Sequence, residues 1–185
     1  MSLTPSKMVP LGTEAPDFIL PDTVSGQQMS LNQLKSEYAT VIMFICNHCP
    51  YVKHVREELV RITNDYTKRA VSFIGISSND IKEYPEDSPG KMREEAIKYG
   101  YSFPYLFDET QEVARDYGAA CTPDFYLFDK RMKLVYRGQL DGSRPGNETP
   151  LTGTDLRNAI DAVLSGNPVS DLQIPSVGCN IKWKD

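Results

Sequence analysis

The stretch from residue 40 to residue 66 constrains the fold more than any other part of the sequence. It begins with Thr40–Ile45, a continuous apolar and β-branched run that predicts a strand buried on both faces. Pro50 then suits the first turn of a helix, because its missing N–H has no intrahelical partner there. The helix that follows carries one apolar stripe, with spacings of 3, 4, 3 and 4 residues, formed by Val52, Val55, Leu59, Ile62 and Tyr66.

The rest of the chain alternates between strand-like and helix-like patterns. This order predicts an α/β protein of three layers, in which helices flank a central mixed β-sheet, and Gly166 stands where the last helix should stop. We expect a polar loop over Ser77–Pro89. The other expected elements are strands at Phe18–Leu20, Val71–Ile76, Asp124–Phe128 and Lys133–Arg137, and helices at Leu31–Lys35, Gly90–Tyr99, Thr110–Tyr117 and Thr154–Leu164.

Length and charge exclude several classes of protein. The 185 residues suit a single domain over residues 1–185, with a C-terminal tail from about residue 168. A net charge of −5 without a Lys/Arg cluster gives no basic footprint for nucleic acid or for an anionic membrane. Because the first ten residues lack the apolar stretch of a secretory signal, we expect a cytoplasmic protein.

Two cysteines stand at the turn between the buried strand and its helix. Cys49 directly precedes Pro50, so its sulfur can face the free N–H groups and the positive end of the helix dipole, which stabilise a thiolate. Cys46, three residues earlier, can come within disulfide range of Cys49 and resolve its oxidised form. His48 between them can favour the thiolate when protonated or accept a proton when neutral. This pattern predicts a redox-active thiol pair, and the competing interpretation is two buried core cysteines.

Three segments resemble a known superfamily. Leu11–Asp22 is similar to the opening of peroxiredoxins, and Phe44–Lys53 to the active-site turn of thioredoxins. Gly118–Asp129 resembles the loop that carries a cis-proline beside that site. The chain is therefore similar to the peroxiredoxin-like branch of the alkyl hydroperoxide reductase/thiol-specific antioxidant superfamily. The resemblance implies a thioredoxin-like fold with an N-terminal extension.

The resemblance also implies roles for single residues. Cys49 matches the nucleophile, Cys49-Pro50 matches the peroxidatic Cys-Pro, and Lys53 matches the lysine after the redox pair. Cys46 stands where peroxiredoxins keep a threonine, and Val52 stands at the usual second cysteine of thioredoxins. The bond Thr122-Pro123 should be cis, with Pro123 beside Cys49 and the loop backbone pairing with a substrate chain.

Two further cysteines and two arginines keep alternatives open. The resemblance brings Cys121 near Cys49, where it is either a second resolving thiol or a packed small residue. Cys179 lies in the tail, where a resolving role matches peroxiredoxins but an inert thiol is favoured. Arg137 and Arg144 are candidates for the arginine that assists peroxide reduction in that family.

We therefore expect an antioxidant thiol oxidoreductase that needs no cofactor and no metal. The Cys49 thiolate attacks a disulfide or a peroxide, and Cys46 resolves the product. Its partners are that substrate and a thiol reductant, either a thioredoxin-like protein or a low-molecular-weight thiol, and a homodimer is compatible with the sequence. One alternative is copper or zinc binding through Cys46, His48, Cys49 and His54, and another is a redox-inactive interaction domain.

Overall fold

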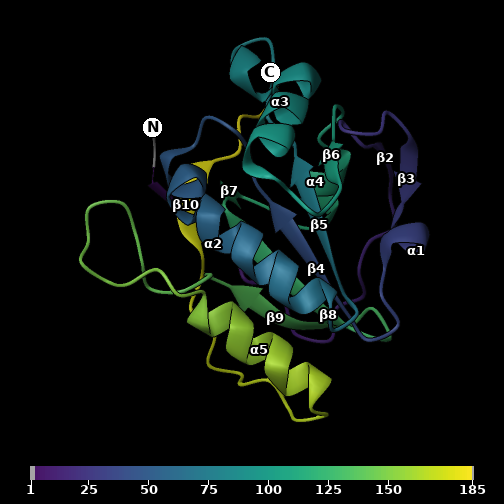
Figure 1. Cartoon of the computed structure of the whole chain (residues 1–185), viewed down its shortest axis with the longest axis vertical. Helices are drawn as coiled ribbons and strands as arrows, with labels where there is room; N and C mark the ends of the chain where they lie inside the picture. Colours follow the sequence, from purple (N-terminus) through teal and green to yellow (C-terminus); the bar gives the residue numbers. More distant parts are fainter. Residues whose placement is uncertain (1–2, 185) are drawn as a thin grey trace.

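A computed structural model describes residues 3–184 and has a five-stranded central sheet (Figure 1). The strand order is β6-β5-β4-β8-β9. The first three of these strands run parallel, and the last two are antiparallel to their neighbours, so the predicted mixed sheet is confirmed. The strands are β4 (Ala39–Phe44), β5 (Val71–Ser77), β6 (Tyr105–Phe107), β8 (Asp124–Asp129) and β9 (Leu134–Gly138).

Helices cover both faces of this sheet, which gives the three layers. Successive residues of β4 face opposite sides: Val41 and Met43 enter one hydrophobic cluster, and Ile42 and Phe44 enter the other. The first cluster includes α2 (Pro50–Thr67), α3 (Pro89–Tyr99) and α5 (Thr154–Leu164). The second includes α1 (Leu31–Leu34) and α4 (Glu112–Asp116).

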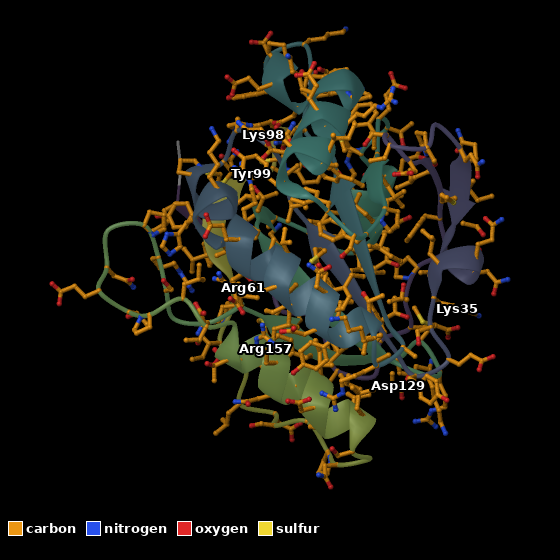
Figure 2. The ribbon with its side chains drawn as sticks, viewed as in Figure 1. Lys35, Arg61, Lys98, Tyr99, Asp129 and Arg157 are labelled. Carbon is orange, nitrogen blue, oxygen red and sulfur yellow. The ribbon has the colours of Figure 1, made fainter. Side chains whose placement is uncertain are left out.

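An ion-pair group joins α2 to α5 across the first layer. Arg157 from α5 and Arg61 from α2 lie close together in Figure 2, and both contact Glu58 at 2.7 Å. The Glu58 side chain is almost fully buried, so its negative charge needs these partners. The pairing fixes the orientation of α2, the helix that begins at Cys49.

A second, three-stranded sheet has the order β1-β10-β7. It joins β1 (Leu3–Pro5), β10 (Val177–Asn180) and β7 (Cys121–Thr122), all antiparallel. The C-terminal tail therefore supplies the middle strand of this sheet, which the sequence patterns did not predict. A separate hairpin pairs β2 (Ile19–Pro21) with β3 (Gln28–Ser30).

The predicted elements are present, with ends shifted by a few residues. The region expected to be a polar loop, Ser77–Pro89, contains the 3-10 helix η1 (Pro85–Asp87). The helix expected over Thr110–Tyr117 shortens to α4, because Gln111 has a left-handed backbone with φ 63° and cannot extend it. Within the described residues, no helix is both long and apolar enough to cross a membrane.

Candidate active site

Cys49 is the N-cap residue of α2, and Pro50 is its first helical residue, as the sequence predicted. The strand β4 ends at Phe44, so the turn between sheet and helix carries both cysteines of the motif. The amide N–H of Lys53 donates to the Cys49 carbonyl at 3.0 Å, while its side chain points into solvent. Cys49 itself is fully buried, with 0% of its surface exposed.

The surroundings of Cys49 favour its thiolate. A hydrogen bond from the thiol of Cys46 is the main reason that the pKa of Cys49 falls to about 5. Burial opposes this shift, whereas the thiol of Cys179 and the backbone amide of Val52 add to it. The predicted effect of the helix start is therefore present, but a neighbouring thiol contributes more to lowering the pKa.

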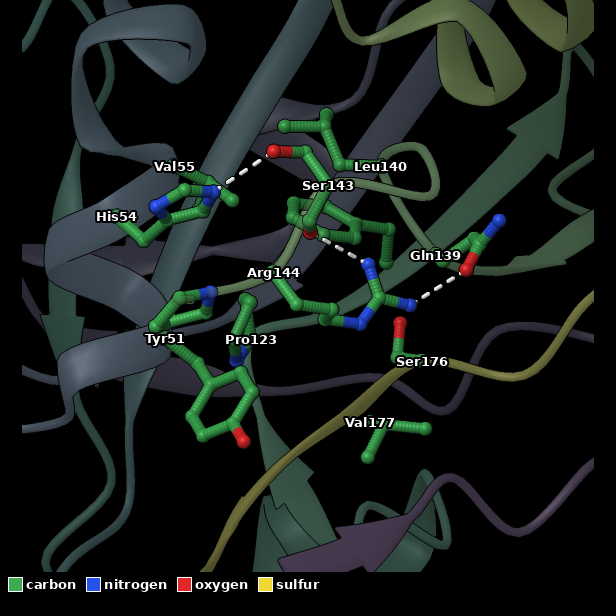
Figure 3. Close-up of a pocket in the computed structure, with 12 residues that line it drawn as sticks. Tyr51, His54, Val55, Pro123, Gln139, Leu140, Ser143, Arg144, Ser176 and Val177 are labelled. Carbon is green, nitrogen blue, oxygen red and sulfur yellow. Dashed lines mark hydrogen bonds between the residues drawn. The ribbon is translucent and has the colours of Figure 1, made fainter. Parts of the chain in front are cut away.

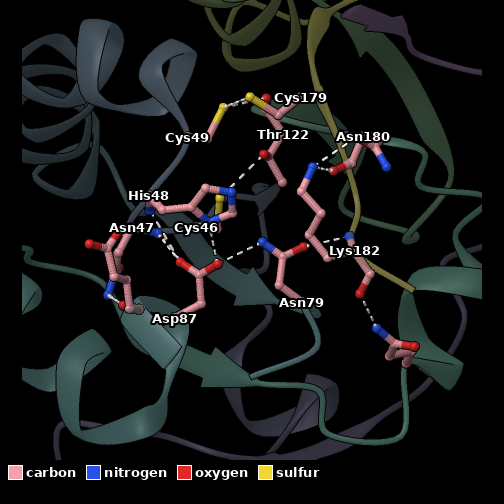
Figure 4. A network of polar contacts seen from close by, with 12 residues as sticks. Cys46, Asn47, His48, Cys49, Asn79, Asp87, Thr122, Cys179, Asn180 and Lys182 are labelled. Carbon is pink, nitrogen blue, oxygen red and sulfur yellow. Dashed lines mark hydrogen bonds and ion pairs between the residues drawn. The ribbon is translucent and has the colours of Figure 1, made fainter. Parts of the chain in front are cut away.

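Cys46 lies beside Cys49 and stays a thiol. Its sulfur is 3.4 Å from the hydroxyl oxygen of Thr122, and 1% of the residue is exposed. Burial raises the pKa of Cys46 well above the ordinary value, and the hydrogen bond to Cys49 and the charge of Asp87 raise it further. The pKa values of the two cysteines are therefore shifted in opposite directions. Figure 4 shows both residues beside Thr122.

His48 forms a close pair with Asp87. Its Nδ1 lies 2.5 Å from a carboxylate oxygen of Asp87, and the ring stacks on Tyr84 with centroids 4.9 Å apart. The same carboxylate accepts hydrogen bonds from the Asn47 amide at 2.8 Å and from the Asn79 side chain at 2.8 Å. His48 Nε2 is buried and, among the described residues, lacks a hydrogen-bond partner. The pair therefore fixes the His48 ring, and one of its nitrogens lies within 4.8 Å of the Cys46 sulfur.

The opposite wall of the site is the loop at Thr122-Pro123, whose peptide bond is cis, as the resemblance implied. The carbonyl oxygen of Thr122 lies 3.3 Å from the sulfur of Cys49. Because the hydroxyl of Thr122 also reaches Cys46, one residue contacts both sulfurs. This loop therefore fixes the distance between the cysteine turn and the second sheet.

Cys179 lies next to Cys49, although its place in the tail gave no geometric reason to expect this. Strand β10 places Cys179 opposite Thr122, and its sulfur lies 2.8 Å from that of Cys49 (Figure 4). Burial and the hydrogen bond to Cys49 raise the pKa of Cys179 to about 12, so it is the proton donor of this pair. Cys179, like Cys46, is therefore in contact with Cys49.

Other residues singled out from the sequence lie elsewhere. Cys121 is fully buried, and its sulfur approaches the Ser176 carbonyl at 4.0 Å, while burial raises its pKa. Arg137 is buried in an ion pair with Asp124, with Nη2 3.0 Å from the carboxylate. Neither of these side chains forms part of the contact between the sulfurs of Cys49 and Cys179.

A small pocket, with an enclosed volume of about 20 Å³, adjoins Pro123 (Figure 3). Tyr51 and His54 from α2 form one side of it, and Arg144 and Val177 lie opposite. Arg144 donates to the Gln139 side chain and to the carbonyl of Ser143 at 2.7 Å. The pocket is therefore a mainly neutral cavity beside the cysteine turn, although it contains an arginine.

The expected set of metal ligands is not assembled. His54 Nε2 lies 2.8 Å from the Ser143 hydroxyl, away from the cysteines. Among the described residues, the sulfur of Cys46, a ring nitrogen of His48 and a carboxylate oxygen of Asp87 do lie within 4.8 Å of one another. The sequence patterns did not indicate Asp87, because it lies in a polar loop far from the motif.

Comparisons with known proteins identify relatives of the whole chain. The chain is similar to an uncharacterized conserved protein from Geobacillus kaustophilus, with 59% identity, a TM-score of 0.98, and coverage of 100% of this chain and 97% of that one. It is 26% identical to the thiol-disulfide oxidoreductase ResA of Geobacillus thermodenitrificans (strain NG80-2), over 71% of this chain and 70% of that protein.

A thioredoxin family protein from Chlorobium tepidum TLS, a thiol:disulfide interchange protein, shares the fold. Its TM-score is 0.64 at 17% identity, over 85% of this chain and 99% of that one. The expected thioredoxin-like fold is thereby confirmed. A model of the AhpC/TSA family matches residues 11–137, a range that spans the cysteine turn and the cis-proline. The chain belongs to the AhpC/TSA family.

Proposed function

We propose that the protein is a thiol oxidoreductase whose nucleophile is the Cys49 thiolate. One observation carries this proposal: the sulfur of Cys49, with its pKa lowered to about 5, lies 2.8 Å from the thiol of Cys179. A thiolate at neutral pH is the reactive form of cysteine, and a thiol in contact with it can resolve the product of the first attack. The AhpC/TSA membership supports this class of reaction.

The reaction has two steps. The Cys49 thiolate attacks one sulfur of a disulfide, forming a mixed disulfide and releasing a thiolate, or it attacks a peroxide oxygen, forming a sulfenic acid. A second cysteine then attacks the Cys49 sulfur, and an internal disulfide forms. We assign this step to Cys46 or Cys179, since both contact Cys49. An external thiol, from a thioredoxin-like protein or a low-mass thiol in the cytoplasm, would return the protein to its dithiol form.

The experiment compares four full-length variants: Cys49→Ser, Cys46→Ser, Cys179→Ser and Cys121→Ser. Reduced protein receives one equivalent of hydrogen peroxide or of a small disulfide, and peptide mass mapping identifies the new disulfide. We expect Cys49→Ser to abolish product formation and Cys121→Ser, the matched control, to leave it intact. Full reactivity of Cys49→Ser would refute the proposal. The other two variants identify the resolving thiol.

A second candidate function, metal binding, rests on Cys46, His48 and Asp87 alone. The close contact between His48 Nδ1 and Asp87 would have to open for both to bind a cation. Metal analysis of protein purified without chelator tests this. Less than about 0.1 equivalent of zinc or copper, with no change in Asp87→Ala, would exclude it.

A further inference from the structure

Strand β10 occupies the edge of β7 beside the cis-proline. Its register places Cys179 opposite Thr122 and Asn180 opposite Cys121. An extended polypeptide that approached Cys49 along β7 would need the same backbone groups. The other edge of β10 is also taken, because it pairs with β1. Among the described residues, the edge of β7 next to Cys179 and Cys49 is therefore already paired, so a polypeptide cannot be added to it.

Gly178 shows how closely β10 fits. A Cβ atom at this position would lie 1.9 Å from the carbonyl oxygen of Thr122 and 2.8 Å from its carbon. Any side chain would collide with the backbone itself, so only glycine permits this approach. The absence of a side chain at Gly178 thus allows Cys179 to reach the sulfur of Cys49.

Residues after β10 hold the strand in place. The Ile181 amide donates to Ala120 at 3.0 Å, and the Lys182 amide donates to the side chain of Asn79 at 2.9 Å. The side chain of Gln111 donates to the Lys182 carbonyl at 2.7 Å. These hydrogen bonds make β10 a fixed wall of the site. Behind the strand, Cys46 and Cys49 are at most 1% exposed, and Cys179 on the strand itself is 3% exposed.

The side of the site next to Pro123 carries a pocket instead of a strand edge. The pocket beside Pro123 is bounded by Tyr51, two residues after Cys49, and by Val177, two residues before Cys179. The space that it encloses is about 20 Å³, which is room for little more than one water-sized group. A low-mass disulfide needs no strand pairing to present its sulfur to Cys49.

We propose, on the basis of the proposed function, that β10 takes the place of a polypeptide substrate and keeps extended polypeptides from Cys49, so that the substrates of Cys49 are low-mass molecules. With a small disulfide RSSR, the Cys49 thiolate forms Cys49–S–S–R and releases RS⁻. The thiol of Cys179 then attacks the Cys49 sulfur. The Cys49–Cys179 bond forms, the bond to R breaks, and the released RS⁻ takes the proton of Cys179.

The test measures single turnovers of the reduced full chain with two probes, 2-hydroxyethyl disulfide and insulin. Rapid acid quench, alkylation and mass spectrometry report the free Cys49 thiol, so no reductant is needed. Since insulin requires an extended segment at the site, we expect wild type to react with it at least about 100-fold more slowly than with the small disulfide. A parallel reaction with hydrogen peroxide shows whether Cys49 is oxidised by peroxides as well as by disulfides.

Gly178→Ala should loosen β10 and raise the insulin rate roughly tenfold relative to the small disulfide. Gly90→Ala is the matched control, because nothing lies within 4 Å of a Cβ at that glycine. Should Gly178→Ala fail to fold, Gln111→Ala removes an anchor of the tail and should raise the same ratio by a smaller factor.

Equal wild-type rates with both probes would overturn the inference, and so would an unchanged ratio in the variant that folds. Oxidation of Cys49 by the small disulfide but not by insulin, with the ratio raised in the variant, supports it. Absence of any reaction at Cys49, with either probe, peroxide or any variant, would refute the proposed function itself. The inference would then fall with it.

Discussion

At the scale of single residues, two thiols donate hydrogen bonds to the sulfur of Cys49. Cys46 and Cys179 are both buried thiols with raised pKa values, and both donate toward Cys49. The charge of Cys49 is therefore stabilised by sulfur neighbours rather than by a cationic side chain. This arrangement links the reactivity of Cys49 directly to the redox state of the other two cysteines.

The pH dependence of Cys49 alkylation follows from this. Because its pKa is lowered to about 5, the thiolate predominates above that pH and declines about tenfold for each pH unit below it. We expect the rate of reaction with iodoacetamide, followed on the Cys49 peptide, to reach half its maximum near pH 5. In Cys46→Ala this midpoint should rise, since the largest stabilising contact is lost. A wild-type midpoint above pH 8 would contradict the assignment.

Asp87 is the second residue for which a sharp effect is expected. Although burial alone would raise its pKa, hydrogen bonds from His48 and Asn79 lower it. Replacement by Asn removes the charge from these bonds, so Asp87→Asn should lower the free energy of unfolding by about 2–3 kcal/mol in urea titrations near pH 7. Asp116→Asn, at an exposed site, is the control.

The sign of the pH effect distinguishes this role from simple packing. A carboxylate with a lowered folded-state pKa stabilises the protein above its unfolded pKa of about 3.9 and loses that contribution as the pH falls through the folded value. The stability gap between wild type and Asp87→Asn should therefore narrow in acid. A gap that stays constant down to pH 3 would assign the effect to shape alone.

At the scale of elements, the two antiparallel strands beside the cis-proline share a buried ion pair. Arg137 on β9 and Asp124 on β8 are both 0% exposed, and the hydroxyl of Ser6 donates to the same carboxylate at 3.0 Å. The charge on Asp124, one residue after Pro123, therefore depends on Arg137. The pair therefore supports the Thr122-Pro123 loop, which contacts the sulfur of Cys49.

Arg137→Met should lower the free energy of unfolding by roughly 3–5 kcal/mol, because it leaves an uncompensated buried carboxylate. The double variant Arg137→Met/Asp124→Asn should recover part of that loss. Urea titration of both proteins provides the measurement. If the free energy of unfolding of Arg137→Met lies within about 1 kcal/mol of the wild-type value, Asp124 becomes neutral at little cost.

Local patterns predicted the elements that depend on neighbours in sequence. The apolar stripe of α2 and the buried run of β4 signal their own structure, and the cysteine turn lies between them. Strands β7 and β10 are short and carry Gly178 and Cys121, so they have no pattern of alternation. They exist because they pair with each other across more than fifty residues of sequence.

The same distinction applies to the site. Cys46, His48 and Cys49 were identified because they are adjacent in the sequence. The contacts of Asp87 with His48 and of Cys179 with Cys49 were not predicted, because only the folded chain brings these residues to the motif. Their contacts are set by a loop and a tail strand, and neither leaves a signal in periodicity.

At the scale of the whole molecule, oxidation should change global stability. A Cys49–Cys179 disulfide would join residues 130 positions apart, which restricts the unfolded chain strongly. For loops of this length the chain-entropy model gives roughly 4–5 kcal/mol. We expect oxidised wild type to unfold at higher urea concentration than the reduced protein, with the difference abolished in Cys179→Ser. Equal midpoints for oxidised and reduced wild type would show that this bond does not form.

The position of β10 also affects how the protein is made. This strand follows every other helix and strand in the sequence, yet it lies between β1 and β7. During synthesis, the residues of the cysteine turn therefore leave the ribosome before the residues of β10. A chain that does not yet include β10 leaves the edge of β7 next to Cys49 unpaired, and an unpaired strand edge is a site for addition of another polypeptide.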